Sequence, residues 1–141
     1  MIANNRQSAA ESMLSTPTKH ALRALMALAS TSSREFVSVG DLAKQTRTPP
    51  AYLAKILRTL SQQKMLASKK GVGGGVSLNR TSITFLEVCE ALKDPIVKDN
   101  CMLSNKRCSK DRPCPFHTKW STQRRAQLEL LSSMKIERKE V

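Results

Sequence analysis

A glycine-rich run, GVGGG at residues 71–75, interrupts the helix-like patterning of this 141-residue chain. Glycine adopts left-handed backbone conformations at little steric cost, so the run predicts a turn. The short apolar segments on either side, residues 65–68 and 76–78, predict two strands that form a hairpin around a flexible tip. The run is not a nucleotide-binding loop, because no Gly-Lys-Ser/Thr follows it and Val76 occupies the sixth position of the dinucleotide fingerprint.

Three helical patterns precede the hairpin. Apolar residues recur at helical spacing over residues 18–29, and Ser38 is placed to cap a short helix that ends near residue 46. Thr48 is expected to cap a third helix whose first position is Pro49, where the missing N–H is harmless. Three helices with a short turn between the second and third, followed by a hairpin, predict a winged helix-turn-helix. The third helix is expected to bury Tyr52, Leu53, Ile56, Leu57 and Leu60.

Beyond the hairpin we expect a helix at about residues 83–92, ended by Pro95, and a last helix from residue 117 or 118 to about 137. Cys89 lies on the apolar face of the former and is expected to be an ordinary buried thiol. The predicted fold is mainly α, with a two-stranded wing, a cysteine-bearing loop and a long C-terminal helix. The last helix carries Leu128, Leu131 and Met134 on one face. The expected divisions are a tail (1–12), a winged helix-turn-helix (13–95), a loop (96–117) and the last helix with its tail (118–141).

Positive charge dominates the chain: 24 Lys and Arg against 11 Asp and Glu give a net charge of +13. Residues 42–86 contain no acidic side chain, and a phosphate backbone would attract this stretch strongly. Aromatic residues make up only 4%, which argues against a base-stacking RNA-binding sheet, so duplex DNA is the expected partner. The basic residues of the acid-free stretch are Lys44, Arg47, Lys55, Arg58, Lys64, Lys69, Lys70 and Arg80.

The third helix of such a fold presents its N-terminal residues to the major groove, and the wing lies near the minor groove or its phosphates. Tyr52 and Lys55 are the preferred contacts, although Tyr52 fits a core position equally well. Each basic residue, taken singly, also fits a solvated helix face. The candidate DNA-binding residues are Thr48, Pro50, Ala51, Tyr52, Lys55, Arg58, Lys69 and Lys70.

Other classes of protein find little support. No apolar run approaches the roughly 18 residues of a membrane span, and the N-terminus lacks the apolar core of a secretory signal. A soluble cytoplasmic protein without a membrane partner is therefore expected. No paired carboxylates, nucleophile–base pair or cofactor loop points to an enzyme.

Three of the four cysteines, Cys101, Cys108 and Cys114, lie close together in the sequence, and His117 follows. In a reducing compartment such a group predicts metal ligands or reactive thiols rather than disulfides. Soft sulfur ligands suit an iron-sulfur cluster, zinc or cuprous copper. The gaps match neither the short zinc knuckles nor the ferredoxin runs, so spacing alone leaves the metal open.

Four segments together resemble the Rrf2 family of winged-helix transcription regulators, which includes IscR, NsrR and RirA. They are LSTPTKHALRALMALA, VSVGDLAKQTRTPPAYLAKILRTLSQQKML, KKGVGGGVSLNR and CMLSNKRCSKDRPCPFH, and the resemblance covers residues 13 to about 136. It implies a homodimer held by the last helix, in which each third helix reads half of an inverted repeat. It also implies an iron-sulfur cluster whose state changes the affinity for DNA.

The resemblance assigns Cys101, Cys108 and Cys114 as cluster ligands, and His117 falls where IscR-like members complete a [2Fe-2S] site. NsrR-type members use an Asp near the start of the first helix for a [4Fe-4S] cluster, and Lys19 stands there in this chain. A [2Fe-2S] cluster is therefore expected, with [4Fe-4S] as the alternative. A regulator of the same fold that uses zinc or reactive thiols, without iron, is the competing hypothesis.

Overall fold

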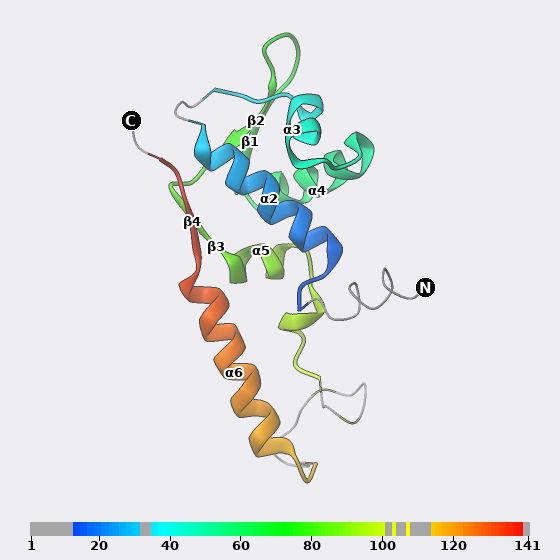
Figure 1. Cartoon of the computed structure of the whole chain (residues 1–141), viewed down its shortest axis with the longest axis vertical. Coiled ribbons are helices and arrows are strands. Elements are labelled where there is room, and N and C mark those ends of the chain that lie inside the picture. The colour runs from blue at the N-terminus through cyan, green and yellow to red at the C-terminus, as the bar shows by residue number, and fades with distance from the viewer. Residues whose placement is uncertain (1–12, 32–34, 101–102, 104–106, 108–113, 140–141) are drawn as a thin grey trace, which may run out of the picture.

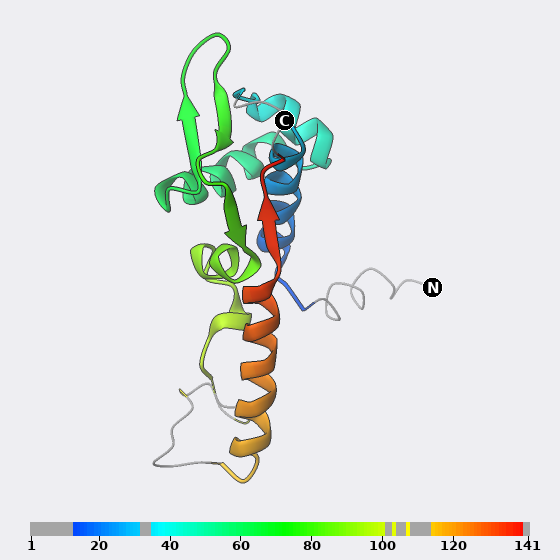
Figure 2. The same cartoon turned by 90° about the vertical axis from the view of Figure 1, so that its left-hand side faces the viewer.

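The computed structural model describes residues 13–31, 35–100, 103, 107 and 114–139. In Figures 1 and 2 a β-hairpin and a long helix, α6, lie at opposite ends of the molecule, with the remaining helices packed between them. No helix in the described ranges is long and apolar enough to cross a membrane. The elements are α2 (Thr16–Ser30), α3 (Val39–Thr46), α4 (Pro50–Gln62), β1 (Leu66–Lys69), β2 (Gly75–Leu78), β3 (Ser82–Thr84), α5 (Phe85–Ala91), the 3₁₀ turn η1 (Pro95–Val97), α6 (His117–Ser133) and β4 (Lys135–Glu137).

Helices α2, α3 and α4 form the core of the helix-turn-helix. Their apolar stripes meet at Leu25, Leu42 and Leu53, all fully buried. Ser38 caps α3 as predicted, because its hydroxyl accepts a hydrogen bond from the Asp41 N–H at 3.1 Å. The winged helix-turn-helix expected from the sequence is confirmed.

The start of α4 differs from the prediction. The helix begins at Pro50 and not at Pro49, and Thr48 does not cap it. The physical reason is that a proline disfavours helical geometry in the residue before it, so Pro50 holds Pro49 in an extended conformation with ψ 131°. Thr48 is instead buried, with 4% of its surface exposed.

The hairpin is confirmed as a wing of two antiparallel strands, with Leu66 opposite Leu78 and Lys69 opposite Gly75. The loop before α3 adds a bridge that the sequence does not reveal: Val37 and Val76 exchange backbone hydrogen bonds of 2.8 and 2.9 Å. A Cβ at Gly75 would collide with the Val37 carbonyl oxygen, so this close approach requires glycine. The base of the wing is thereby fixed to the helical core.

The C-terminal segment returns to the domain as a strand. The last helix ends at Ser133, not near residue 137, because residues 135–137 form β4 and pair with β3. For the same reason α5 begins at Phe85, two residues later than predicted. Ile83 and Ile136 face each other in this pairing and are 1% and 5% exposed. Each three-residue strand pairs with a partner distant in the sequence, so local patterns do not reveal it.

A buried carboxylate, Asp94, joins the start of α2 to the segment after α5. Its Oδ2 accepts hydrogen bonds from the Ser15 N–H, the Ser15 hydroxyl and the Thr18 hydroxyl at 2.9, 2.8 and 2.6 Å. Its Oδ1 accepts one from the Ile96 N–H at 3.0 Å. Burial alone would raise the pKa of Asp94, but these four hydrogen bonds outweigh it and hold the pKa below its usual value. Asp94 thus remains ionised and crosslinks the two segments.

We predict that Asp94→Asn lowers the free energy of unfolding at pH 7 by roughly 2–4 kcal/mol, because buried donors lose a charged acceptor. A carboxylate with a lowered folded-state pKa stabilises the fold above its unfolded pKa and loses that contribution as pH falls through the folded pKa. Urea unfolding between about pH 2 and pH 7 should therefore show a smaller acid loss of stability in the variant than in the wild type. Equal acid losses in the two proteins would contradict the assignment.

Candidate nucleic-acid interface and cluster loop

The outward face of α4 carries the DNA-contact candidates. Its buried stripe, Leu53, Ile56, Leu57 and Leu60, packs into the core. Pro50, Ala51, Lys55 and Arg58 lie on the opposite side and are exposed. Helical geometry therefore brings these four candidates onto one accessible face of α4.

Two other candidates anchor α4 to α2. The Thr48 hydroxyl lies 2.9 Å from Nδ1 of His20, and the Tyr52 ring meets the His20 ring edge-on at 5.5 Å. Partial burial, followed by the nearby charges of Arg23 and Lys19, lowers the pKa of His20. A neutral imidazole therefore fixes the turn before α4, and half-buried Tyr52 packs beside it. No local sequence pattern singles out His20, because its partner lies 28 residues away.

The wing presents the remaining candidates. Lys69 and Lys70 are exposed at the end of β1. The Lys69 ammonium also lies 6.0 Å from the centre of the Phe36 ring. The structure thus places two cations near the hairpin tip, on a wing whose base is held by Val37.

The loop that leads to the cysteines is fastened to α6 by Arg124. Its guanidinium donates hydrogen bonds to the carbonyl oxygens of Val97 and Lys98, at 3.2 and 3.0 Å. It also forms an ion pair of 3.2 Å with Asp99. No local sequence signal identifies this role, because the partners lie more than 20 residues from Arg124.

The next residues of the loop are paired as well. Asn100 forms an antiparallel bridge with Arg107, and its carbonyl oxygen accepts a hydrogen bond of 3.0 Å from the Trp120 indole. Arg107 lies 3.7 Å from Asp99 in a second ion pair. Asn100 and Arg107 directly precede Cys101 and Cys108 in the sequence, and of the two Asn100 is the one that bonds to α6.

Of the four proposed ligands, Cys114 and His117 fall within the described residues, and Cys101 and Cys108 lie outside them. The His117 N–H donates to the Cys114 carbonyl at 3.0 Å, which forms the turn that begins α6. Cys114 and His117 are both partly exposed. The described ranges contain no group of three or more His, Cys, Asp or Glu side chains arranged for a metal ion. The full ligand set therefore remains a prediction.

Cys89 is separate from this loop, as predicted. It is fully buried on α5. Burial, and secondarily the charges of Asp94 and Glu90, raises the pKa of its thiol to about 11. Cys89 is a core residue with little thiolate character.

The fold, together with the exposed basic residues on α4 and on the wing, is typical of winged-helix DNA-binding proteins. A family model described as Rrf2, iron-dependent transcriptional regulator, matches residues 14–138. A protein of Aquifex aeolicus (strain VF5), named as an HTH-type transcriptional regulator, is 35% identical over 112 residues, which cover 77% of each chain. A similarly named protein of Azotobacter vinelandii is 26% identical over 109 residues, covering 76% of this chain and 66% of its own.

Solved structures share the fold. IscR of T. potens superposes with a TM-score of 0.67 at 19% identity, over 91% of this chain and 85% of its own. CymR, the global cysteine regulator of B. subtilis, superposes with a TM-score of 0.72 at 22% identity, over 89% and 93%. The chain belongs to the Rrf2 family. It is a DNA-binding transcription regulator and not an enzyme.

We predict that iodoacetamide at pH 8 modifies Cys114 in the native metal-free protein and leaves Cys89 intact. With a pKa of about 11, only about one thousandth of Cys89 is thiolate at that pH, and the thiolate is the nucleophile. Peptide mass spectrometry after timed labelling gives both rates in one sample. Unfolding in urea should abolish the difference, and comparable native rates would contradict the burial of Cys89.

Proposed function

We propose that this regulator binds duplex DNA as a homodimer, and that an iron-sulfur cluster on Cys101, Cys108, Cys114 and His117 controls its affinity. The α4 helix enters the major groove with Lys55 and Arg58 on its accessible face, and Lys69 and Lys70 of the wing contact flanking phosphates or the minor groove. His20 and Thr48 do not read bases but hold α4 in position.

The observation that carries the cluster proposal is the arrangement of the described residues around the loop. Asn100 and Arg107, directly before two of the cysteines, are paired with each other, and Trp120 of α6 holds Asn100. The turn from Cys114 to His117 leads into the same helix. Three thiolates and an imidazole match a [2Fe-2S] cluster, and Lys19 on α2 offers no carboxylate for a [4Fe-4S] site. When bound, the cluster supplies a centre that accepts or loses one electron and that oxidants can destroy.

A chain of described contacts links this loop to the DNA-binding surface. The segment that enters the loop, η1, is tied through Asp94 to Ser15 and Thr18 at the start of α2. Farther along α2, His20 holds the turn before α4. Cluster loss would release the loop, loosen the Asp94 crosslink and shift α4 between stronger and weaker binding states.

The homodimer proposal rests on the projecting part of α6. In Figures 1 and 2 this helix extends away from the rest of the protein. Leu131, near its C-terminal end, is fully buried against its own domain, so part of the stripe predicted from the sequence is already covered. Phe116 and Leu130 remain 54% and 52% exposed, and Phe116 and Trp120 line a hollow of about 310 Å³. A second α6 would cover these apolar side chains.

A second candidate is a regulator that responds through its thiols without a cluster. The winged-helix fold is shared with CymR, which is described as a global cysteine regulator and has been solved in S. aureus in an oxidised form. The same cysteines would then form a reversible disulfide or bind zinc. The two candidates share DNA binding and differ only in the chemistry of the loop.

We predict that anaerobically purified protein shows visible absorption and a native mass with one [2Fe-2S] cluster per chain. Cys114→Ala should lose the cluster, and its DNA affinity should equal that of the metal-free wild type, differing from the cluster-bound protein by about 5–150-fold. Binding is measured at fixed salt on duplexes selected by the wild-type protein. Cys89→Ala is the matched control and should keep the cluster.

Two outcomes would overturn this proposal in different ways. Equal DNA affinity with and without the cluster would show that the cluster does not control DNA binding. A colourless protein that binds zinc or forms a disulfide, even after reconstitution, would favour the second candidate.

We predict that Leu130→Glu weakens the dimer by at least 10-fold in dissociation constant, about 1.4 kcal/mol, because a charge would enter an apolar interface. Sedimentation equilibrium measures the constant, and circular dichroism checks that the helix persists. Glu129→Gln, a neighbouring exposed position on α6, is the control. A dimer unaffected by Leu130→Glu would place the interface elsewhere.

A further inference from the structure

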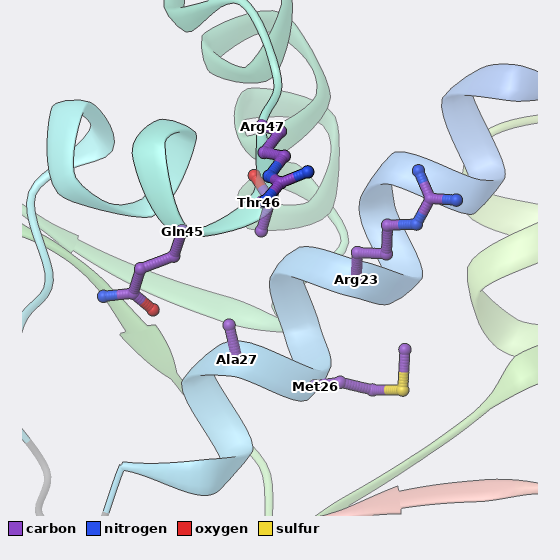
Figure 3. A pocket seen from close by; sticks show the side chains of 6 residues that line it. All are labelled: Arg23, Met26, Ala27, Gln45, Thr46 and Arg47. Atoms are coloured by element: carbon purple, nitrogen blue, oxygen red, sulfur yellow. The ribbon is translucent and has the colours of Figure 1, made fainter.

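A hollow of about 450 Å³ lies between α2 and the end of α3, outside the surfaces assigned above. Figure 3 shows its lining: Arg23, Met26 and Ala27 come from α2, and Gln45, Thr46 and Arg47 come from the end of α3 and the turn that follows. Two arginine side chains, one from each helix segment, therefore line one depression.

The charge of this hollow is positive. Neither Arg23 nor Arg47 forms an ion pair with any other residue that the structure describes, and no acidic side chain lines the hollow. The charge of Arg23 acts on its surroundings, because after burial it is the next cause that lowers the pKa of His20. Guanidinium groups donate several hydrogen bonds in a planar fork that matches phosphate oxygens. The hollow thus has the chemistry of a phosphate site.

Arg47 is presented by a fixed backbone. It adopts a left-handed conformation with φ 52° at the end of α3. The Arg47 N–H bonds the Lys44 carbonyl at 3.3 Å, and the Thr48 N–H bonds the Ala43 carbonyl at 3.0 Å. The turn is therefore held by backbone hydrogen bonds at Arg47 and Thr48, which limits the backbone entropy lost when Arg47 binds an anion.

The hollow is too open for a buried small molecule. Arg23, Gln45 and Arg47 at its rim are all exposed, and 47% of Met26 is accessible. Small-molecule sites usually bury most of the surface of their ligand. An open basic depression suits a phosphate that belongs to a polymer lying across the surface.

We propose that this hollow seats a backbone phosphate of the bound duplex, contacted by Arg23 and Arg47, and so extends the DNA footprint from α4 and the wing to α2. This inference rests on the proposed reading of DNA by α4. Arg47 stands three residues before Pro50, the first residue of α4, a chain distance of at most about 11 Å. Phosphates flank the groove that the start of α4 enters, so a phosphate lies within reach of the hollow.

The test compares Arg23→Gln/Arg47→Asn with the wild type in DNA binding from about 50 to 200 mM salt. Asparagine tolerates the left-handed conformation, so the turn is retained. Loss of one phosphate contact should lower the slope of log affinity against log salt by about 0.9 per subunit. Lys93→Asn/Lys135→Gln, which removes two exposed charges outside α4, the wing, the cysteine loop and α6, corrects for the loss of net charge and should change the slope less. Thermal unfolding confirms that each variant is folded, and the single variants replace the double variant if it is not.

A phosphate scan of the selected duplex locates the contact. A neutral methylphosphonate replaces one backbone phosphate at a time. At one position per half-site, this replacement should weaken DNA binding by the wild type but should not weaken DNA binding by the double variant any further. The inference is overturned if no such position exists, or if the double variant and the control lose the same slope. It is also overturned if the double substitution abolishes binding of inorganic phosphate but leaves the DNA slope unchanged. A wild type without salt-dependent DNA binding would instead contradict the proposed reading by α4.

Discussion

The buried carboxylate of Asp94 is the interaction on which the arrangement of this protein depends. It lies where α2 begins, α5 ends and the cysteine loop departs, and it accepts hydrogen bonds from two of these segments. A carboxylate removed from water is stable only when its oxygens accept hydrogen bonds, and four donors supply them here. The same bonds hold the start of α2, where the Ser15 side chain bonds to Asp94 instead of capping the helix. The position of α2 is thus determined by a residue nearly 80 positions away.

From α2 the structure extends in two directions. Toward the DNA-binding surface, His20 holds the turn that places α4, and Val37 fixes the base of the wing. Toward the other end, β4 returns α6 to the domain by pairing with β3. The Lys139 N–H also bonds the Ala29 carbonyl at 3.2 Å, which brings the end of the chain back to α2. One helix therefore contacts both the segment proposed to sense a signal and the segment proposed to read DNA.

Much of the fold is predictable because its helices are strongly amphipathic. The spacing of Leu22, Leu25 and Ala29 predicts α2, and Ser38 predicts the start of α3. Met26 belongs to the same predicted pattern but is 47% exposed. The start of α4 is harder to predict, because Pro49 and Pro50 both suit the first helical position. Pro50 determines the boundary, since a proline disfavours helical geometry in the residue before it. The exposure of Lys55 and Arg58 follows from the helical period, whereas the burial of Thr48 depends on His20, a partner from another helix.

The sequence by itself determined the class of fold, the basic character of one surface and the set of cysteines, because periodicity, glycine turns and composition are local properties. Only the tertiary structure decided that residues 135–137 form a strand, that Arg124 and Trp120 hold the loop, and that Arg23 and Arg47 share a hollow. Each of these features joins residues that are far apart in the chain. Their free energy comes from pairing and packing that exist only once the helices have assembled, so no local pattern records them.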